Sequence, residues 1–112
     1  LIYAGNFVDL GLYPTQQDVN DQHWIFPGEM AEKSMLQVAE LAPHADAIVV
    51  NGMPNFRRSD GRPQRIVSLQ TQLEALTERP IVSSDSALYW RIFKTLGLTP
   101  TQSHGCLLSM LT

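Results

Sequence analysis

Apolar residues recur every three or four positions between residues 29 and 42, which is the spacing of one face of an α-helix. The residues on this face are Ala31, Met35, Val38, Ala39 and Ala42. Glu29 and Glu32 would lie in the first helical turn, where negative charge suits the helix dipole. Pro43 then interrupts the pattern. The pattern predicts a helix over residues 29–42.

The same spacing predicts a second helix, and capping residues indicate a third. A second helical stripe consists of Ile66, Leu69, Leu73 and Leu76. Its helix is expected to start near Pro63, a residue type that suits a first helical turn. The third helix is expected from about Asp85 to Leu96. Ser84 or Asp85 would cap its start, and Gly97 would cap its end.

Two short apolar runs alternate with these helices. The runs are Ala47–Val50 and Pro80–Ser83, and their β-branched residues are typical of strands that are covered on both faces. The order helix, strand, helix, strand, helix predicts parallel pairing of the two strands. We therefore expect residues 1–112 to form a single α/β domain. Its expected architecture is a three-layer, Rossmann-like arrangement with a short parallel sheet flanked by helices.

The remaining segments show weaker patterns. Leu1–Ala4 is expected to form a short strand, and the polar stretch Gln16–His23 is expected to be a surface loop. Met53–Gly61 is also expected to be a loop. Tyr89 and Trp90 are adjacent on the third helix, so at most one of them faces the core fully, and the other is left to face a partner or a cleft.

Composition narrows the class of protein. The net charge of -3 argues against a nucleic-acid binder, although Arg57, Arg58, Arg62 and Arg65 form a local basic group. No run of about 18 apolar residues is present, so no membrane span is expected. No charged segment followed by an apolar one opens the sequence, so no signal peptide is expected, and the single cysteine, Cys106, excludes an intrachain disulfide. These features favour a cytoplasmic protein.

Two segments follow the predicted strands, where open parallel sheets bind their ligands. The first contains Asn51, Gly52 and Met53, and the second contains Ser83 and Ser84 at the start of a helix. Hydroxyl groups and backbone N–H groups at a helix N-terminus favour an anion such as a carboxylate. The alternatives are that Ser84 and Asp85 only cap the helix and that Asn51-Gly52 only forms a turn. Asp85 opposes an anion unless its carboxylate turns away.

Other side chains give no clear site. His23, His44 and His104 are too scattered to indicate a metal site, and we expect no metal and no cofactor. His104 could lower the pKa of the Cys106 thiol. The position of Cys106 after the last predicted helix instead favours a buried or partly buried structural thiol.

These same segments resemble the second half of maleate cis-trans isomerases and arylmalonate decarboxylases, members of the aspartate/glutamate racemase superfamily. The resemblance covers roughly residues 29–110. It rests on Ala45–Val50, on the helix that ends Leu73-Glu74-Ala75-Leu76, on Arg79–Trp90 and on the tail His104–Leu108.

The resemblance implies the C-terminal half of a two-half, cofactor-independent enzyme that isomerises or decarboxylates small dicarboxylic or 2-substituted carboxylic acids. In such enzymes each half ordinarily supplies one cysteine, but this sequence has Asn51 and Gly52 at the matching position. The catalytic residues are therefore unknown. Asn51, Gly52, Met53, Ser83 and Ser84 carry over only as carboxylate-binding residues.

Three functions remain open from the sequence. The first is an isomerase or decarboxylase whose thiol comes from another segment, and the second is a non-catalytic carboxylate-binding or regulatory domain. The third, a nucleotide-binding module, is the weakest because no glycine-rich phosphate-binding motif follows either strand. An isolated half would expose apolar surface, so we expect a homo-oligomer or a continuation into a longer chain.

Overall fold

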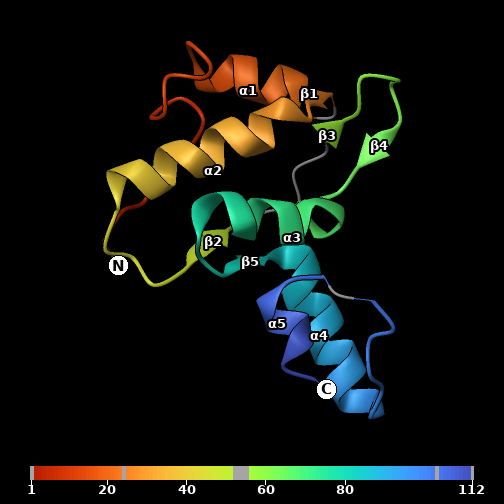
Figure 1. Ribbon diagram of the computed structural model, residues 1–112. Coiled ribbons are helices and arrows are strands. Elements are labelled where there is room, and N and C mark those ends of the chain that lie inside the picture. The colour runs from red at the N-terminus through yellow and green to blue at the C-terminus, as the bar shows by residue number, and fades with distance from the viewer. Residues whose placement is uncertain (1, 24, 52–55, 103, 112) are drawn as a thin grey trace.

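The computed structural model describes residues 2–23, 25–51, 56–102 and 104–111, and its helices and strands form an α/β domain, as predicted (Figure 1). In chain order the elements are α1 (Gln16–Gln22), β1 (Phe26–Pro27), α2 (Glu29–Leu41), β2 (Ile48–Val50), β3 (Phe56–Arg57), β4 (Pro63–Gln64), α3 (Ile66–Thr77), β5 (Ile81–Ser83), α4 (Ser84–Leu96) and α5 (Cys106–Ser109).

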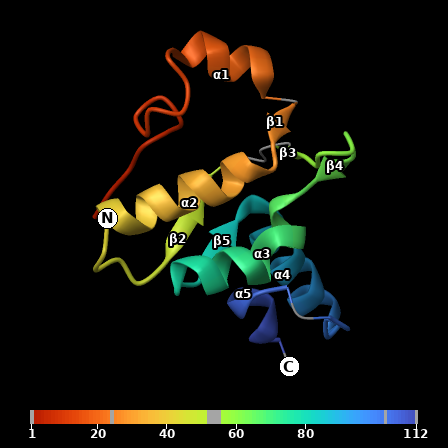
Figure 2. The same ribbon diagram turned by 45° about the horizontal axis from the view of Figure 1, so that its top comes forward.

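The two apolar runs form the predicted parallel pair. β2 lies beside β5, with Ile48 paired with Ile81 and Val50 paired with Ser83. Figure 2 shows the two strands side by side, with α3 crossing in front of them. In the part of the chain that the structure describes, the parallel sheet contains only these two strands.

A second, smaller sheet was not predicted. β1 pairs with β3 in parallel through Phe26 and Phe56, and β3 pairs with β4 in antiparallel orientation. Residues 53–61 were predicted to be a loop. Residues 53–55 lie outside the described residues, Phe56–Arg57 forms β3, and residues 58–61 form a turn.

The three predicted helices are present, with shifts at their starts. α2 runs from Glu29 to Leu41, almost as expected. Pro63 lies in β4 and not in a first helical turn, because the chain stays extended as far as Arg65 and α3 begins only at Ile66. Gly97 ends α4 with a φ of 65°, a left-handed conformation that glycine adopts without strain.

Two predictions for the N-terminal segment are wrong. Residues 16–22 form the helix α1 and not a loop, because Thr15 and Asp18 make a capping box at its start. Residues 2–4 form no strand, and residue 1 lies outside the described residues.

A single apolar core joins α2, α3 and both sheets. Ala31 on α2, Leu73 on α3 and Ile81 on β5 are fully buried in it. An aromatic cluster extends the core towards the N-terminus, with Phe26 lying 5.0 Å from Phe7 between ring centroids. The core residues are Tyr13, Phe26, Ala31, Met35, Ile48, Phe56, Ile66, Leu69, Leu73 and Ile81.

Arg79, in the connection before β5, closes the C-terminal end of α2. Its guanidinium donates hydrogen bonds to the carbonyl oxygens of Ala42 at 2.8 Å, Pro43 at 2.9 Å and Ala39 at 3.2 Å. Carbonyls at a helix end otherwise have no partner within the helix. The connection into β5 is therefore held against the end of α2.

The packing of the core predicts that two leucines of α3 contribute very differently to the free energy of unfolding. Leu73→Ala should lower the free energy of unfolding by about 2–5 kcal/mol, because it removes a buried side chain and leaves a cavity. Leu76→Ala, a matched change at a 44% exposed position on the same helix, should cost less than about 1 kcal/mol. Urea denaturation followed by circular dichroism measures both values. Equal losses would contradict the described packing of α3.

Candidate binding site at the carboxyl edge of the parallel strands

The register of the parallel pair brings the two predicted segments to one edge. Because Val50 lies beside Ser83, the chain leaves both strands at the same end, through Asn51 from β2 and Ser84 into α4. Asn51 is exposed and Ser84 is half-buried. Gly52 and Met53, the other two predicted residues, lie outside the described residues.

Ser83 caps α4, whereas the sequence favoured Ser84 or Asp85 for this role. The Ser83 hydroxyl oxygen accepts a hydrogen bond from the backbone N–H of Ser86 at 3.1 Å, and the Ser86 hydroxyl oxygen accepts one from the N–H of Ser83 at 2.9 Å. Both serines are buried. The predicted cap at Ser84 or Asp85 is therefore wrong by at least one residue, and of the two predicted serines Ser84 has the more accessible surface.

Asp85 is paired with Arg65, and this partnership was not foreseen. The Arg65 guanidinium lies 3.5 Å from the Asp85 carboxylate, which is almost fully buried. Arg65 itself is about half exposed and immediately precedes α3. An arginine partner offsets the negative charge that Asp85 would otherwise place near a bound anion. In the sequence, Arg65 stands out only as part of a local basic group.

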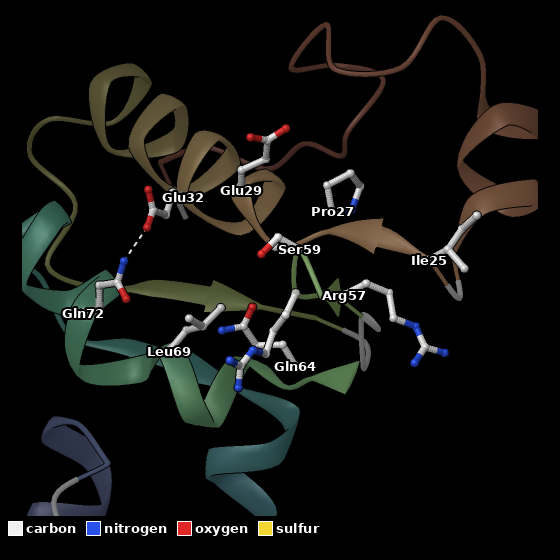
Figure 3. Close-up of a pocket in the computed structure, with 11 residues that line it drawn as sticks. Ile25, Pro27, Glu29, Glu32, Arg57, Ser59, Gln64, Leu69 and Gln72 are labelled. Atoms are coloured by element: carbon white, nitrogen blue, oxygen red, sulfur yellow. Dashed lines mark hydrogen bonds between the residues drawn. The ribbon is translucent and has the colours of Figure 1, made fainter. Parts of the chain in front are cut away.

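One cavity of about 700 Å³ lies between α2, α3 and the smaller sheet (Figure 3). Glu29 and Glu32 from α2, and Arg57 and Gln64 from the sheet, are among the residues that line it. The Gln72 side chain donates a hydrogen bond to Glu32, which joins α3 to α2. None of the predicted site residues that the structure describes lines this cavity.

A larger cavity of about 890 Å³ lies between the N-terminal segment, α1, α2 and β2. Its lining is mostly apolar, with Phe26, Met35 and Val50 among its walls, and Asn51 also lines it. A concave apolar space with few polar groups is typical of small-molecule sites. Within the described residues, Ser83 and Ser84 line neither cavity, so Asn51 and Ser84 share an edge but no described pocket.

Cys106 lies away from this edge. The Glu74 carboxylate accepts hydrogen bonds from the backbone N–H of Cys106 at 2.9 Å and from the N–H of Ile81 at 3.0 Å. Because Ile81 begins β5, Cys106 lies near the amino end of that strand, opposite to Asn51 and Ser84. The side chain of Cys106 is exposed, so the prediction of a buried or partly buried thiol is wrong.

Glu74 also controls the protonation of the thiol. A hydrogen bond to Glu74, followed by partial desolvation and by the charge of Glu74, raises the pKa of Cys106 above its ordinary value. The sequence had suggested that His104 could lower it, and the structure gives the opposite direction. A thiol that stays protonated is a weak nucleophile.

The described part of the chain contains no group of three or more histidine, cysteine, aspartate or glutamate side chains that could hold a metal ion. The longest described helices have 13 residues, and no described helix has the length and apolar character needed to cross a bilayer.

Comparisons with known proteins add no assignment: no protein-family model, no curated protein and no solved structure matches the chain.

The link between Glu74 and Cys106 predicts a change in thiol reactivity. Glu74→Gln removes the negative charge, so the pKa of Cys106 should fall and alkylation by iodoacetamide should become faster at pH 8. The rate against pH, followed by mass spectrometry, should shift to lower pH. Glu40→Gln, on the exposed side of α2, should leave the profile unchanged. An unchanged profile for Glu74→Gln would contradict the described contact.

Proposed function

We propose that the chain binds a small dicarboxylate or a related carboxylic acid at the carboxyl edge of β2 and β5. The observation that carries this proposal is the parallel register, which brings Asn51 and the N-terminus of α4 to the same edge. Ligands of open parallel sheets bind at this edge.

The chemistry of the edge suits a carboxylate. The Ser83 hydroxyl oxygen already accepts a hydrogen bond from the N–H of Ser86. The N–H groups of Ser84 and Asp85 belong to the first turn of the helix, where N–H groups have no carbonyl partner within the helix. Together with the Ser84 hydroxyl and the Asn51 amide, these groups would donate hydrogen bonds to an anion. Arg65 offsets the charge of Asp85.

The reaction class that we propose is cofactor-independent isomerisation or decarboxylation of that acid. This step rests on the resemblance to maleate isomerases and arylmalonate decarboxylases. Such chemistry needs a thiol beside the bound carboxylate. Cys106 lies at the other end of β5, so the proposal requires the thiol from a segment outside residues 1–112 or from another chain. This chain would then supply the carboxylate-binding half.

A second candidate is a non-catalytic carboxylate-binding or regulatory domain. The position of Cys106 favours this candidate, because it leaves the chain without a thiol of its own at the carboxyl edge. The two candidates share the binding site and differ only in turnover. For either one we propose a cytoplasmic location, in keeping with a single cysteine and no intrachain disulfide.

The proposal predicts binding of malonate or maleate. Either ligand should raise the thermal midpoint of the protein, and titration calorimetry should give a measurable Kd. Asn51→Ala and Ser84→Ala should each weaken binding about tenfold, the effect of one hydrogen bond to a charged group. Thr99→Ala, at an exposed position after α4, should not change the Kd.

Malonamide, which has the same shape without the charge, should not bind. Binding of malonate that is insensitive to both Asn51→Ala and Ser84→Ala would exclude the carboxyl edge as the site. Turnover of maleate or of an arylmalonate, followed by NMR, would separate the two candidates: product formation supports the enzyme, and saturable binding without product supports the regulatory domain.

A further inference from the structure

Helix α4 has an unusual distribution of apolar residues. Among its thirteen residues the buried ones are Asp85 and Ser86, both polar and both in the first turn. Apolar side chains instead face outwards in a row that we call the α4 stripe. The α4 stripe consists of Leu88, Tyr89, Ile92 and Leu96, which are 53%, 39%, 42% and 65% exposed.

The spacing makes the stripe one continuous surface. Leu88, Ile92 and Leu96 are four positions apart, so they lie along one side of the helix, and Tyr89 broadens the row. Trp90, the neighbour of Tyr89, is half-buried, and the Lys94 ammonium lies 4.5 Å from the centre of its ring. Trp90 and Lys94 thus belong to the other side of α4.

The exposed area is comparable with the largest apolar patch of a typical monomeric protein, which is often functional. With about 150–250 Å² for a large apolar side chain, the four residues expose roughly 300–500 Å² together. A standard interface covers about 800 Å² per partner, of which somewhat more than half is apolar, or roughly 450 Å². The stripe therefore offers the apolar area that one side of a stable interface needs.

We propose that the α4 stripe is the contact surface of a homodimer, in which α4 packs against α4 of a second copy in antiparallel orientation. The dimer does not rest on the proposed carboxylate function. Figure 1 shows α4 extending away from α1 and α2, with α5 beside it, so a second helix has room to approach.

A twofold axis that passes through Ile92 would bring the α4 stripes of two copies into contact. Ile92 lies midway between Leu88 and Leu96, so an antiparallel partner would place its own Leu96 against Leu88. Charged side chains do not oppose this contact. Lys94 lies on the Trp90 side, and Asp85 is paired with Arg65. Arg91 flanks the row at the rim, where interfaces are polar. The two helix dipoles would also run in opposite directions, which is favourable.

The state of association tests the proposal. Sedimentation equilibrium of the full chain from about 1 to 500 µM should show a reversible dimer of twice 12.5 kDa. Ile92→Glu places two like charges at the axis, so it should raise the dimer Kd by about 100-fold or more. Ala87→Glu adds the same charge to an exposed position of α4 away from the stripe, and it should leave the Kd within about threefold.

A mixture of variants tests the twofold geometry. Ile92→Glu and Ile92→Lys should each be monomeric alone, and an equimolar mixture should recover dimers, because opposite charges then meet at the axis. Circular dichroism confirms that each variant is folded, and Leu96→Glu replaces Ile92→Glu if that variant does not fold. A wild-type chain that stays monomeric at 500 µM overturns the proposal. Dimers that persist in Ile92→Glu, oligomers that grow beyond two copies, or a mixture that fails to pair also overturn it.

Discussion

The fold depends on the backbone pairing of β5, which is satisfied on both of its edges. On one edge β5 pairs with β2, and the N–H of Ile48 donates to the carbonyl of Pro80 at 3.0 Å. Successive backbone groups of a strand point to opposite sides, so the N–H and carbonyl of Ile81 face away from β2. Two side chains of α3 meet them: Glu74 accepts from the N–H, and Gln70 donates to the carbonyl. The crossover helix thus takes the place of a neighbouring strand, and the edge of β5 is closed.

The same carboxylate fixes the C-terminal part of the chain. Glu74 accepts a second backbone hydrogen bond from Cys106 and so holds the first turn of α5 against α3. The backbone at the start of α5 lies very close to α3. Gly105 has a φ of 90°, and a Cβ at that position would collide with the side chains of Gln70 and Glu74. One glutamate therefore joins α3, β5 and α5, and it also raises the pKa of the Cys106 thiol.

The sequence predicted the elements that carry a clear apolar pattern or capping residues at both ends, and it missed those that have neither. α2 and α3 carry periodic apolar faces, and both were found. α1 buries no residue, so it has no apolar period, and its evidence is the polar capping pair Thr15 and Asp18. β1, β3 and β4 have two residues each, and β1 pairs with a strand about thirty positions away. Such pairing is decided by tertiary contacts and leaves no local pattern.

At the candidate site, parallel pairing was enough to predict that Asn51 and Ser84 lie at the same edge of the sheet. It was not enough to predict the role of each side chain. The partner of Asp85 is Arg65, twenty positions earlier, and only the folded chain brings them together. The cap shifted by one residue because β5 runs directly into α4, so Ser83 is both the last strand residue and the N-cap. A sequence pattern that expects a connection between strand and helix assigns the cap one position too late.

The direct junction between β5 and α4 also explains the outward apolar face of α4. With no connecting residues, the Ser83 and Ser86 pair sets the direction in which the helix leaves the sheet. Only the first turn is then buried, and it is polar, as a helix start with a cap and a salt bridge requires. Burial cannot be the reason for Leu88, Ile92 and Leu96, because all three are exposed within the described fold. Exposed leucine and isoleucine side chains are stabilised when another surface covers them. The row carries no charge and has Leu88 and Leu96 at equal distances from Ile92, so a second copy of the same helix fits it in antiparallel orientation.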